Sequence, residues 1–155
     1  GTNSLIKNGV PQIMATLTLD TAKKIIEAAR AKGRELNLKP LTVTVLDVHG
    51  VTVATEREDG SSLLRPKVAH GKAYGAISLG IGSRAIFNRA QEQPYFIQSV
   101  NALADGHLVP VPGGVLIKDA GTLIGAVGIT GDTSDNDEAC AIAGIEAVGL
   151  TADAG

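Results

Sequence analysis

A glycine at every third position of one apolar segment is the strongest constraint that this sequence places on its fold. Gly125, Gly128 and Gly131 fall within or just after the run from Leu123 to Ile129, which otherwise has the composition of a β-strand. Glycine weakens a strand because it adds no side chain for packing, so its repetition indicates that another group lies close to the backbone. That group is a helix packed on the sheet or a bound ligand, and the sequence alone leaves both open.

Two turns bracket this glycine-rich segment. The Pro-Gly-Gly run at 112–114 is a turn, because proline presets one backbone angle and glycine accepts either sign of φ. Residues 115–118 then form a short apolar strand, and the Asp-Ala-Gly run at 119–121 has the composition of a hairpin turn. The sequence therefore predicts an antiparallel hairpin with strands near 115–118 and 122–129.

Further strands and helices are predicted on both sides of this hairpin. Valine and threonine alternate over 41–45, and a returning strand over 51–56 follows a turn that contains His49. Residues 108–111 are predicted to be another strand. This order of elements indicates an α+β fold, a five-stranded antiparallel sheet flanked by helices. Three of the predicted helices have an N-cap in the sequence, Thr18, Ser83 or Asp135, and two others begin near Pro66 and at Pro94.

We expect residues 16–155 to form a single domain and residues 1–15 to form an N-terminal arm, since an Asn-Gly pair and a proline break any regular pattern there. The helix that begins near Pro66 contains Gly71 and Gly75. These glycines are four residues apart and share one helix face, so they permit another segment of backbone to approach closely.

Composition excludes several classes of function. With 14 basic and 16 acidic residues and a net charge of -2, the chain lacks the basic excess of a nucleic-acid-binding protein. It has no apolar run of about 18 residues, so we expect no membrane partner, and a cytoplasmic location unless a leader has been removed. The single cysteine, Cys140, excludes a disulfide within the chain. Two Tyr, two Phe and no Trp leave a thin aliphatic core, which favours a homo-oligomer.

Lys67, His70 and Tyr74 lie at positions i, i+3 and i+7 of the second predicted helix and therefore share one face. An imidazole can be an axial ligand of haem iron, a phenol can replace it, and a lysine can pair with the propionates. The same face suits a small anionic ligand, and it is also what an ordinary exposed helix face presents. His107, which precedes the Pro-Gly-Gly turn, is a second candidate ligand.

The predicted site lies between the second helix and the turn at 112–114, where glycines leave backbone amides unshielded for an anion or a planar ligand. Its candidate catalytic residues are His70, Lys72 and Tyr74, and His70 is also the candidate metal ligand if the cofactor is haem. The candidate ligand-binding residues are Arg65, Lys67, His107, Pro112, Gly113, Gly114, Gly125, Gly128 and Asp137.

Three segments of the C-terminal half resemble one known family. PGGV at 112–115, DAGTLIGAVGITG at 119–131 and DNDEACAIAGIEA at 135–147 are similar to the GlcG/HbpS-like family, which includes the C-terminal domain of PduO-type proteins. The resemblance runs from about Thr16 to Thr151. It implies a profilin-like or PAS-like fold, an oligomeric assembly, and haem binding, haem degradation or haem sensing by some members.

Two functions of different classes follow. The resemblance implies a haem- or tetrapyrrole-binding module with haem as its cofactor. The residues alone are also consistent with an enzyme or binder for an organic acid that needs no cofactor. It would transfer protons as in an isomerase, lyase or hydratase, with His70, Tyr74, Lys72, Arg65, His107 and a carboxylate. A structural accessory subunit is a third interpretation. The expected ligand is anionic in both of the first two.

Overall fold

The computed structural model of this protein describes residues 6–7, 10–11 and 16–155, so most of the arm expected over 1–15 lies outside the described residues. Within that arm, β1 (Ile6–Lys7) and β2 (Val10–Pro11) pair in antiparallel fashion.

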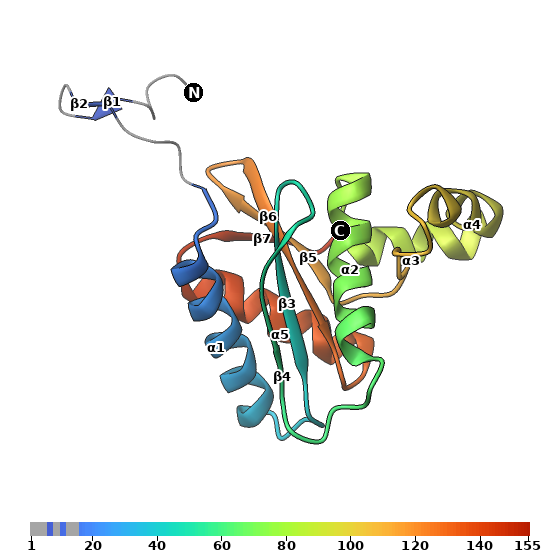
Figure 1. Ribbon diagram of the computed structural model, residues 1–155, viewed down its shortest axis with the longest axis horizontal. Helices are drawn as coiled ribbons and strands as arrows, with labels where there is room; N and C mark the ends of the chain where they lie inside the picture. The colour runs from blue at the N-terminus through green and yellow to red at the C-terminus, as the bar shows by residue number, and fades with distance from the viewer. Residues whose placement is uncertain (1–5, 8–9, 12–15) are drawn as a thin grey trace.

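A five-stranded antiparallel sheet forms the centre of the molecule, in the order β4-β3-β6-β5-β7 (Figure 1). Its central strand β6 pairs with β3 on one side and with β5 on the other, so that Val127 lies opposite both Val45 and Val115. The predicted α+β fold and the hairpin formed by β5 and β6 are confirmed. The strands are β3 (Thr42–Asp47), β4 (Thr52–Arg57), β5 (Gly114–Asp119), β6 (Thr122–Thr130) and β7 (Thr151–Asp153).

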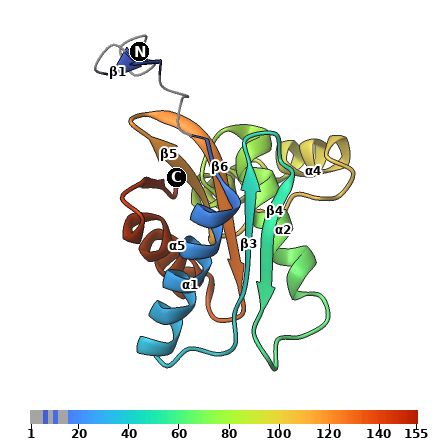
Figure 2. The same ribbon diagram turned by 60° about the vertical axis from the view of Figure 1, so that its left-hand side comes forward.

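Helices cover both faces of this sheet (Figures 1 and 2). α1 (Leu19–Glu35) and α5 (Ser134–Ala147) lie together on one face, and α2 (Arg65–Leu79) lies on the other. α3 (Ser83–Glu92) and α4 (Pro94–Leu103) follow α2 and extend away from the sheet. In the described part of the chain, no helix combines the length and the apolar character that crossing a bilayer requires.

The two faces of the sheet are packed differently. Large aliphatic side chains such as Ile25, Ile26 and Ile145 fill the layer between the sheet and the pair α1 and α5. On the α2 face the buried helix residues are small, with Ala73 and Ala76 packed against the sheet. Small side chains allow α2 to lie close to the strands, which brings its backbone into contact with theirs.

That close approach explains the glycines of β6. A Cβ atom at Gly128 would collide with the carbonyl oxygen of Ala69 in α2, and a Cβ at Gly131 would collide with the carbonyl oxygen of Pro40. A Cβ at Gly125 would collide with the carbonyl oxygen of Leu46 on the neighbouring strand. Of the two explanations that the sequence left open, the structure therefore shows close packing of protein backbone at these positions.

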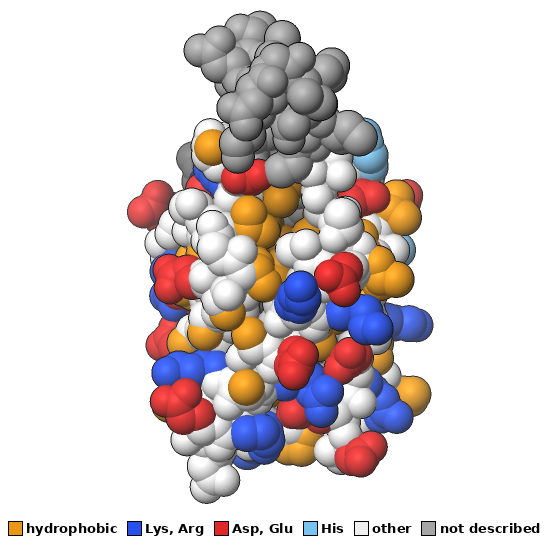
Figure 3. All heavy atoms as spheres, turned by 90° about the vertical axis from the view of Figure 1, so that its left-hand side faces the viewer, with side chains coloured by type: hydrophobic (Ala, Val, Ile, Leu, Met, Phe, Trp, Pro, Cys, Tyr) orange, Lys and Arg blue, Asp and Glu red, His pale blue; other side chains and the backbone are white. Residues whose placement is uncertain are grey.

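Ion pairs join α1 to the edge strand β4 and the residue that follows it. Arg30 donates to Glu56 at 2.7 Å and to Glu58 at 3.2 Å, and Arg34 donates to Glu58 at 3.2 Å. On this side of the molecule, basic and acidic side chains are interspersed (Figure 3). Charged side chains along an exposed sheet edge discourage pairing with a strand from another chain.

One predicted strand is wrong. Residues 108–111 form no strand, and β7 supplies the fifth strand by pairing with β5. The backbone N–H of Val109 donates to the carbonyl oxygen of Gly71 in α2 at 3.1 Å, so this segment bonds to the helix and not to the sheet. An apolar run beside a turn has the same composition whether it pairs with a sheet or bonds to a helix. Only the tertiary structure shows which of these partners it has.

Two predicted helix caps also differ from the structure. The N-cap of α5 is Thr133, whose hydroxyl accepts from the N–H of Asn136 at 3.2 Å, and Asp135 lies inside the first turn. α3 begins at Ser83 itself, after Gly82, and the Ser83 hydroxyl accepts from the N–H of Gly114 at 2.7 Å. Thr18 caps α1 as predicted.

We predict that Gly128→Ala destabilises the fold, because the new methyl group would force α2 away from β6. Overpacking of this kind costs about 1–3 kcal/mol of unfolding free energy. Urea unfolding followed by circular dichroism measures it. Thr122→Ala, at the exposed end of the same strand, is the control and should change stability by less than about 0.5 kcal/mol. Equal stability of Gly128→Ala and the parent protein would contradict the packing argument.

Candidate functional site

Three ring side chains meet on the outer face of α2. His70 and Tyr74 are one helical turn apart, and their rings stack with centroids 5.3 Å apart and planes 21° apart. The ring of His107 meets both edge-on, with its centroid 5.8 Å from that of His70 and 5.9 Å from that of Tyr74. Such geometries are the favourable ones for aromatic pairs, so each ring restrains the orientation of the other two.

Gly71 and Gly75 of α2 leave room for the segment that contains His107 to pack on the helix. A side chain at Gly71 would collide with Val109, and one at Gly75 would collide with Leu108, so the predicted close approach to these glycines is confirmed. The segment that carries His107 thus lies directly on the helix. It is fixed there by the bond from Val109 to Gly71 and by the N–H of Leu108, which donates to Asn101 at 3.0 Å.

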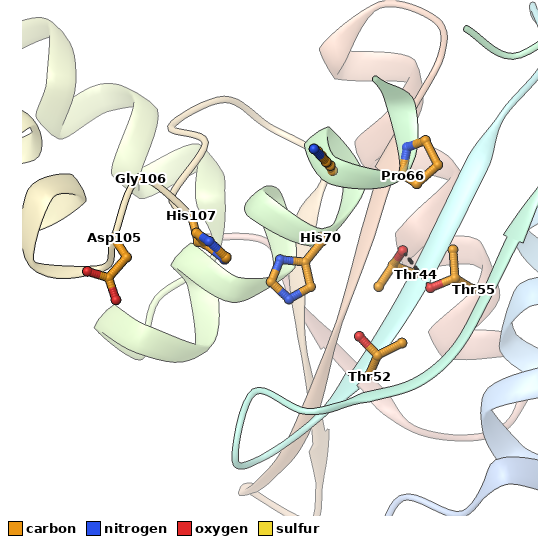
Figure 4. Close-up of a pocket in the computed structure, with 9 residues that line it drawn as sticks. Thr44, Thr52, Thr55, Pro66, His70, Asp105, Gly106 and His107 are labelled. Atoms are coloured by element: carbon orange, nitrogen blue, oxygen red, sulfur yellow. Dashed lines mark hydrogen bonds between the residues drawn. The ribbon is translucent and has the colours of Figure 1, made fainter. Parts of the chain in front are cut away.

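A sharp turn between α4 and His107 completes this arrangement. Asp105 and Gly106 have φ angles of 56° and 78°, both in the left-handed region. A non-glycine residue pays for that conformation, and such residues concentrate at functional sites. The turn places the Asp105 carboxyl group and the His107 ring at the same wall (Figure 4).

A cavity of about 720 Å³ opens beside the rings (Figure 4). Its walls come from three parts of the chain: the first two turns of α2, the turn after α4, and strands β3 and β4. This volume lies within the range of about 300–1,000 Å³ that is usual for small-molecule sites. The lining residues are Thr44, Thr52, Thr55, Pro66, Lys67, His70, Asp105, Gly106 and His107.

Burial lowers the pKa of His70 below its ordinary value of 6.5, and the nearby His107 lowers it further by repulsion between the two positive charges. The imidazole of His70 therefore stays neutral at pH values where a free histidine would begin to protonate. A neutral imidazole keeps a lone pair that can bind a metal ion or accept a proton.

Lys72 lies in the interior, two positions after His70 and on another face of α2. Its ammonium group is 3.1 Å from the Asp137 carboxylate and donates to the Ile129 carbonyl oxygen at 2.9 Å. Lys72 is 2% exposed and Asp137 is 1% exposed. Burial lowers the pKa of Lys72 and raises that of Asp137, since desolvation penalises both charges, and their mutual attraction opposes both shifts.

The structure divides the predicted site residues into two groups. Lys67, His70, Tyr74 and His107 lie at or beside the cavity. The other residues do not line it. Lys72 and Asp137 pair in the interior, Arg65 donates to Thr130 at 2.7 Å, and the glycines and Pro112 are packed against protein: Pro112, Gly113, Gly114, Gly125 and Gly128 are all buried.

Sequence reasoning missed the sheet side of the cavity and its acidic residue. Thr44, Thr52 and Thr55 come from strands whose alternation shows which residues share a face but not what faces them. Asp105 had a usable signal, because an Asp-Gly pair next to a candidate histidine indicates a turn that positions it.

A comparison with protein-family models matches residues 17–146 to the family described as "Haem degrading protein HbpS-like". The chain belongs to the HbpS-like family. One relative is a 15.0 kDa protein from the dhaT-dhaS intergenic region of Citrobacter freundii. It is 34% identical to this chain, over 81% of this chain and 87% of its own length.

Solved structures of this HbpS-like fold resemble the chain closely in shape. The Klebsiella pneumoniae protein ORFY is 25% identical, with a TM-score of 0.78 over 91% of this chain and 95% of its own. A crystal structure described as a PduOC:haem complex has a TM-score of 0.79 at 24% identity, over 88% of this chain and 97% of its own. These likenesses show the fold.

We predict that Lys72→Met destabilises this HbpS-like protein strongly, because it leaves the Asp137 carboxylate buried without its partner. Breaking a buried pair in this way costs about 3–5 kcal/mol. The double variant Lys72→Met/Asp137→Leu removes both charges and should recover much of that loss. Urea unfolding of the single and double variants measures the difference. A double variant less stable than Lys72→Met would contradict the assignment of this pair to the packing of the interior.

Proposed function

We propose that this protein binds a tetrapyrrole, haem foremost, in the cavity beside His70, Tyr74 and His107. The observation that carries the proposal is the meeting of two imidazoles and a phenol at one wall of a cavity large enough for a small molecule. Two facts about other proteins support it: the family model describes haem-degrading proteins, and the PduOC neighbour was crystallised with haem.

The residues present fit such a ligand. Histidine is the commonest protein ligand of haem iron, and tyrosine serves in its place in some proteins. His70 is the candidate ligand, because its ring lines the cavity beside those of Tyr74 and His107 and its lowered pKa favours the neutral imidazole. The stacked ring of Tyr74 restrains the orientation of His70, and Lys67 supplies a positive charge for the carboxylates that a haem carries.

Each side chain then has a distinct part in binding. His70 holds the metal, and Tyr74 and His107 keep the imidazole ring of His70 in place. The turn at Asp105 sets the position of His107. Once bound, haem would supply the iron redox and oxygen chemistry that degradation or sensing of haem requires. Because the cavity opens at the surface, a ligand can enter it without any rearrangement of the core.

We predict that the purified protein binds haemin with a Soret absorbance change, and that His70→Ala weakens this binding by about tenfold or more, equal to roughly 1.4 kcal/mol. His107→Ala should weaken it less, because that residue restrains His70 without holding the metal. Absorbance titrations measure the affinities, and the Soret position reports loss of an imidazole ligand. His49→Ala is the matched control, since His49 is exposed in the β3–β4 turn and does not line the cavity.

Equal haemin affinity in the parent protein, His70→Ala and His107→Ala would contradict the proposal. So would an equal loss in His49→Ala, which would indicate adventitious binding to surface histidines. The thermal midpoint of each variant shows whether weaker binding results from the loss of a ligand contact or from a destabilised fold. His70 is only half-buried, so its removal should leave the thermal midpoint within a few degrees of the parent value.

One observation favours a second function, proton transfer on a small organic acid. A neutral imidazole 5.8 Å from a second imidazole, with Lys67 in the same cavity, suits a general base acting on a carboxylate substrate. An unchanged haemin spectrum together with thermal stabilisation by small carboxylates would support this function instead.

We also propose that the protein assembles into a homo-oligomer, because several large apolar side chains remain exposed. Leu63 is 94% exposed, Leu103 is 84% exposed and Tyr95 is 66% exposed. Apolar side chains that are exposed in one chain can be buried in a contact between subunits. We predict a mass of at least two chains by light scattering at micromolar concentration, and a mass of one chain of 15.8 kDa would refute the proposal.

A further inference from the structure

Three threonines form the sheet side of the cavity, across from His70 and His107 (Figure 4). We call these two histidines and Tyr74 the ring cluster. Thr44 lies on β3, and Thr52 and Thr55 lie on the edge strand β4. We call these three residues the threonine floor. They belong to no catalytic or ligand motif in the sequence, and the ring cluster makes no use of them.

A β-bulge places Thr52 on this floor. Along a regular strand, residues 52 and 55 would point to opposite faces of the sheet. Here Val45 pairs with Ala54 and Leu46 pairs with Thr52, so β4 carries one extra residue, Val53. Val53 and Ala54 both pack against the core on the α1 face, and Thr52 joins Thr55 at the cavity. Bulges commonly redirect a side chain next to a functional site.

The hydroxyl groups of the floor leave a donor for a ligand. Thr44 Oγ1 and Thr55 Oγ1 are 3.0 Å apart, and either atom can be the donor. Each hydroxyl has one hydrogen to donate, so a pair that shares one bond retains one hydrogen. Thr44 is 1% exposed, whereas Thr55 is exposed. When Thr44 donates to Thr55, the exposed Thr55 hydroxyl keeps its own hydrogen for an acceptor in the cavity.

Charge indicates which acceptor fits. Lys67 also lines the cavity and lies in the first turn of α2. Pro66, the residue before it, lies near Thr44 and Thr55 in Figure 4. The acidic residue of the lining, Asp105, comes from the turn beside His107, on the other side of His70. The threonine hydroxyls and Pro66, which precedes Lys67 in the chain, therefore lie on one side of His70, and the Asp105 carboxylate lies on the other.

We propose that the threonine floor and Lys67 bind the carboxylate groups of the ligand, while the ring cluster holds its macrocycle. This inference rests on the proposed function and extends it, because it assigns the carboxylate end of the tetrapyrrole to β3 and β4. Hydroxyl and ammonium donors directed at a carboxylate form charge-assisted hydrogen bonds, which are stronger than neutral ones. The floor then distinguishes a tetrapyrrole with free carboxylates from one without them.

Two probes test the assignment: haemin, which has two free carboxylates, and haemin dimethyl ester, which has none. Thr55→Val and Thr52→Val remove a hydroxyl while keeping the size and β-propensity of the side chain. We expect Thr55→Val to weaken haemin binding by about tenfold and Thr52→Val by several-fold, with the affinity for the dimethyl ester unchanged in both. Lys67→Met should show the same selectivity. Absorbance titrations give the dissociation constants, and circular dichroism checks the fold.

Thr42→Val is the matched control. Thr42 lies on β3 two residues before Thr44 and is 0% exposed, but it does not line the cavity. Its hydroxyl has no hydrogen-bond partner in the structure. Its replacement should leave the affinity for both probes unchanged and should not lower the thermal midpoint, because an unpaired buried hydroxyl opposes folding.

Parent-like haemin binding by Thr55→Val, Thr52→Val and Lys67→Met would overturn the assignment, and the proposed function would stand if His70→Ala still weakened binding. An equal loss for haemin and for the dimethyl ester would also overturn it, since the floor would then contact the macrocycle. Failure of the parent protein to bind haemin at all would overturn both proposals together.

Discussion

The contact between the backbones of α2 and β6 determines most of what this protein can do. Ala69 of the helix lies against Gly128 of the strand at a distance that leaves no room for a methyl group. This contact fixes the helix in rotation as well as in position. One face of α2 turns Lys72 inward to Asp137, and another turns His70 and Tyr74 outward to the cavity. His70 and Lys72 are only two residues apart in the sequence, yet His70 faces the cavity and Lys72 lies in the interior.

Local patterns were enough to predict much of the fold. The β5–β6 hairpin follows from its turn residues, and the shared face of Lys67, His70 and Tyr74 follows from helical spacing. The fifth strand was misplaced because residues 108–111 form a hydrogen bond to Gly71, a partner nearly 40 residues away in the chain. Alternation and turn composition carry no information about such a partner.

The candidate site was harder to predict than the fold for the same reason. Helical spacing identified the residues of α2 that face outward, but Lys72 was included because its charge suggested chemistry. Its burial depends on Asp137, which lies 65 positions later in the chain. Thr52 faces the cavity through a bulge, and a bulge shifts alternation by one residue without any mark in the composition of β4. The family resemblance predicted the fold correctly and implied a class of ligand, whereas the residues that line the cavity could be identified only from the structure.

The attachment of the His107 segment has a consequence for how cavities of this kind can diversify. Two walls of the cavity belong to the sheet and to α2, whose backbones pack against each other, so a shift of either element disturbs the core. The third wall follows α3 and α4, which pack around their own small cluster of Ile86, Ile97 and Leu108 and extend away from the sheet. Insertions or substitutions in this helical pair can move Asp105 and His107 while the strands remain in register. A cavity in which the sheet and α2 stay fixed, while the segment after α4 varies, can change its ligand and keep the same fold.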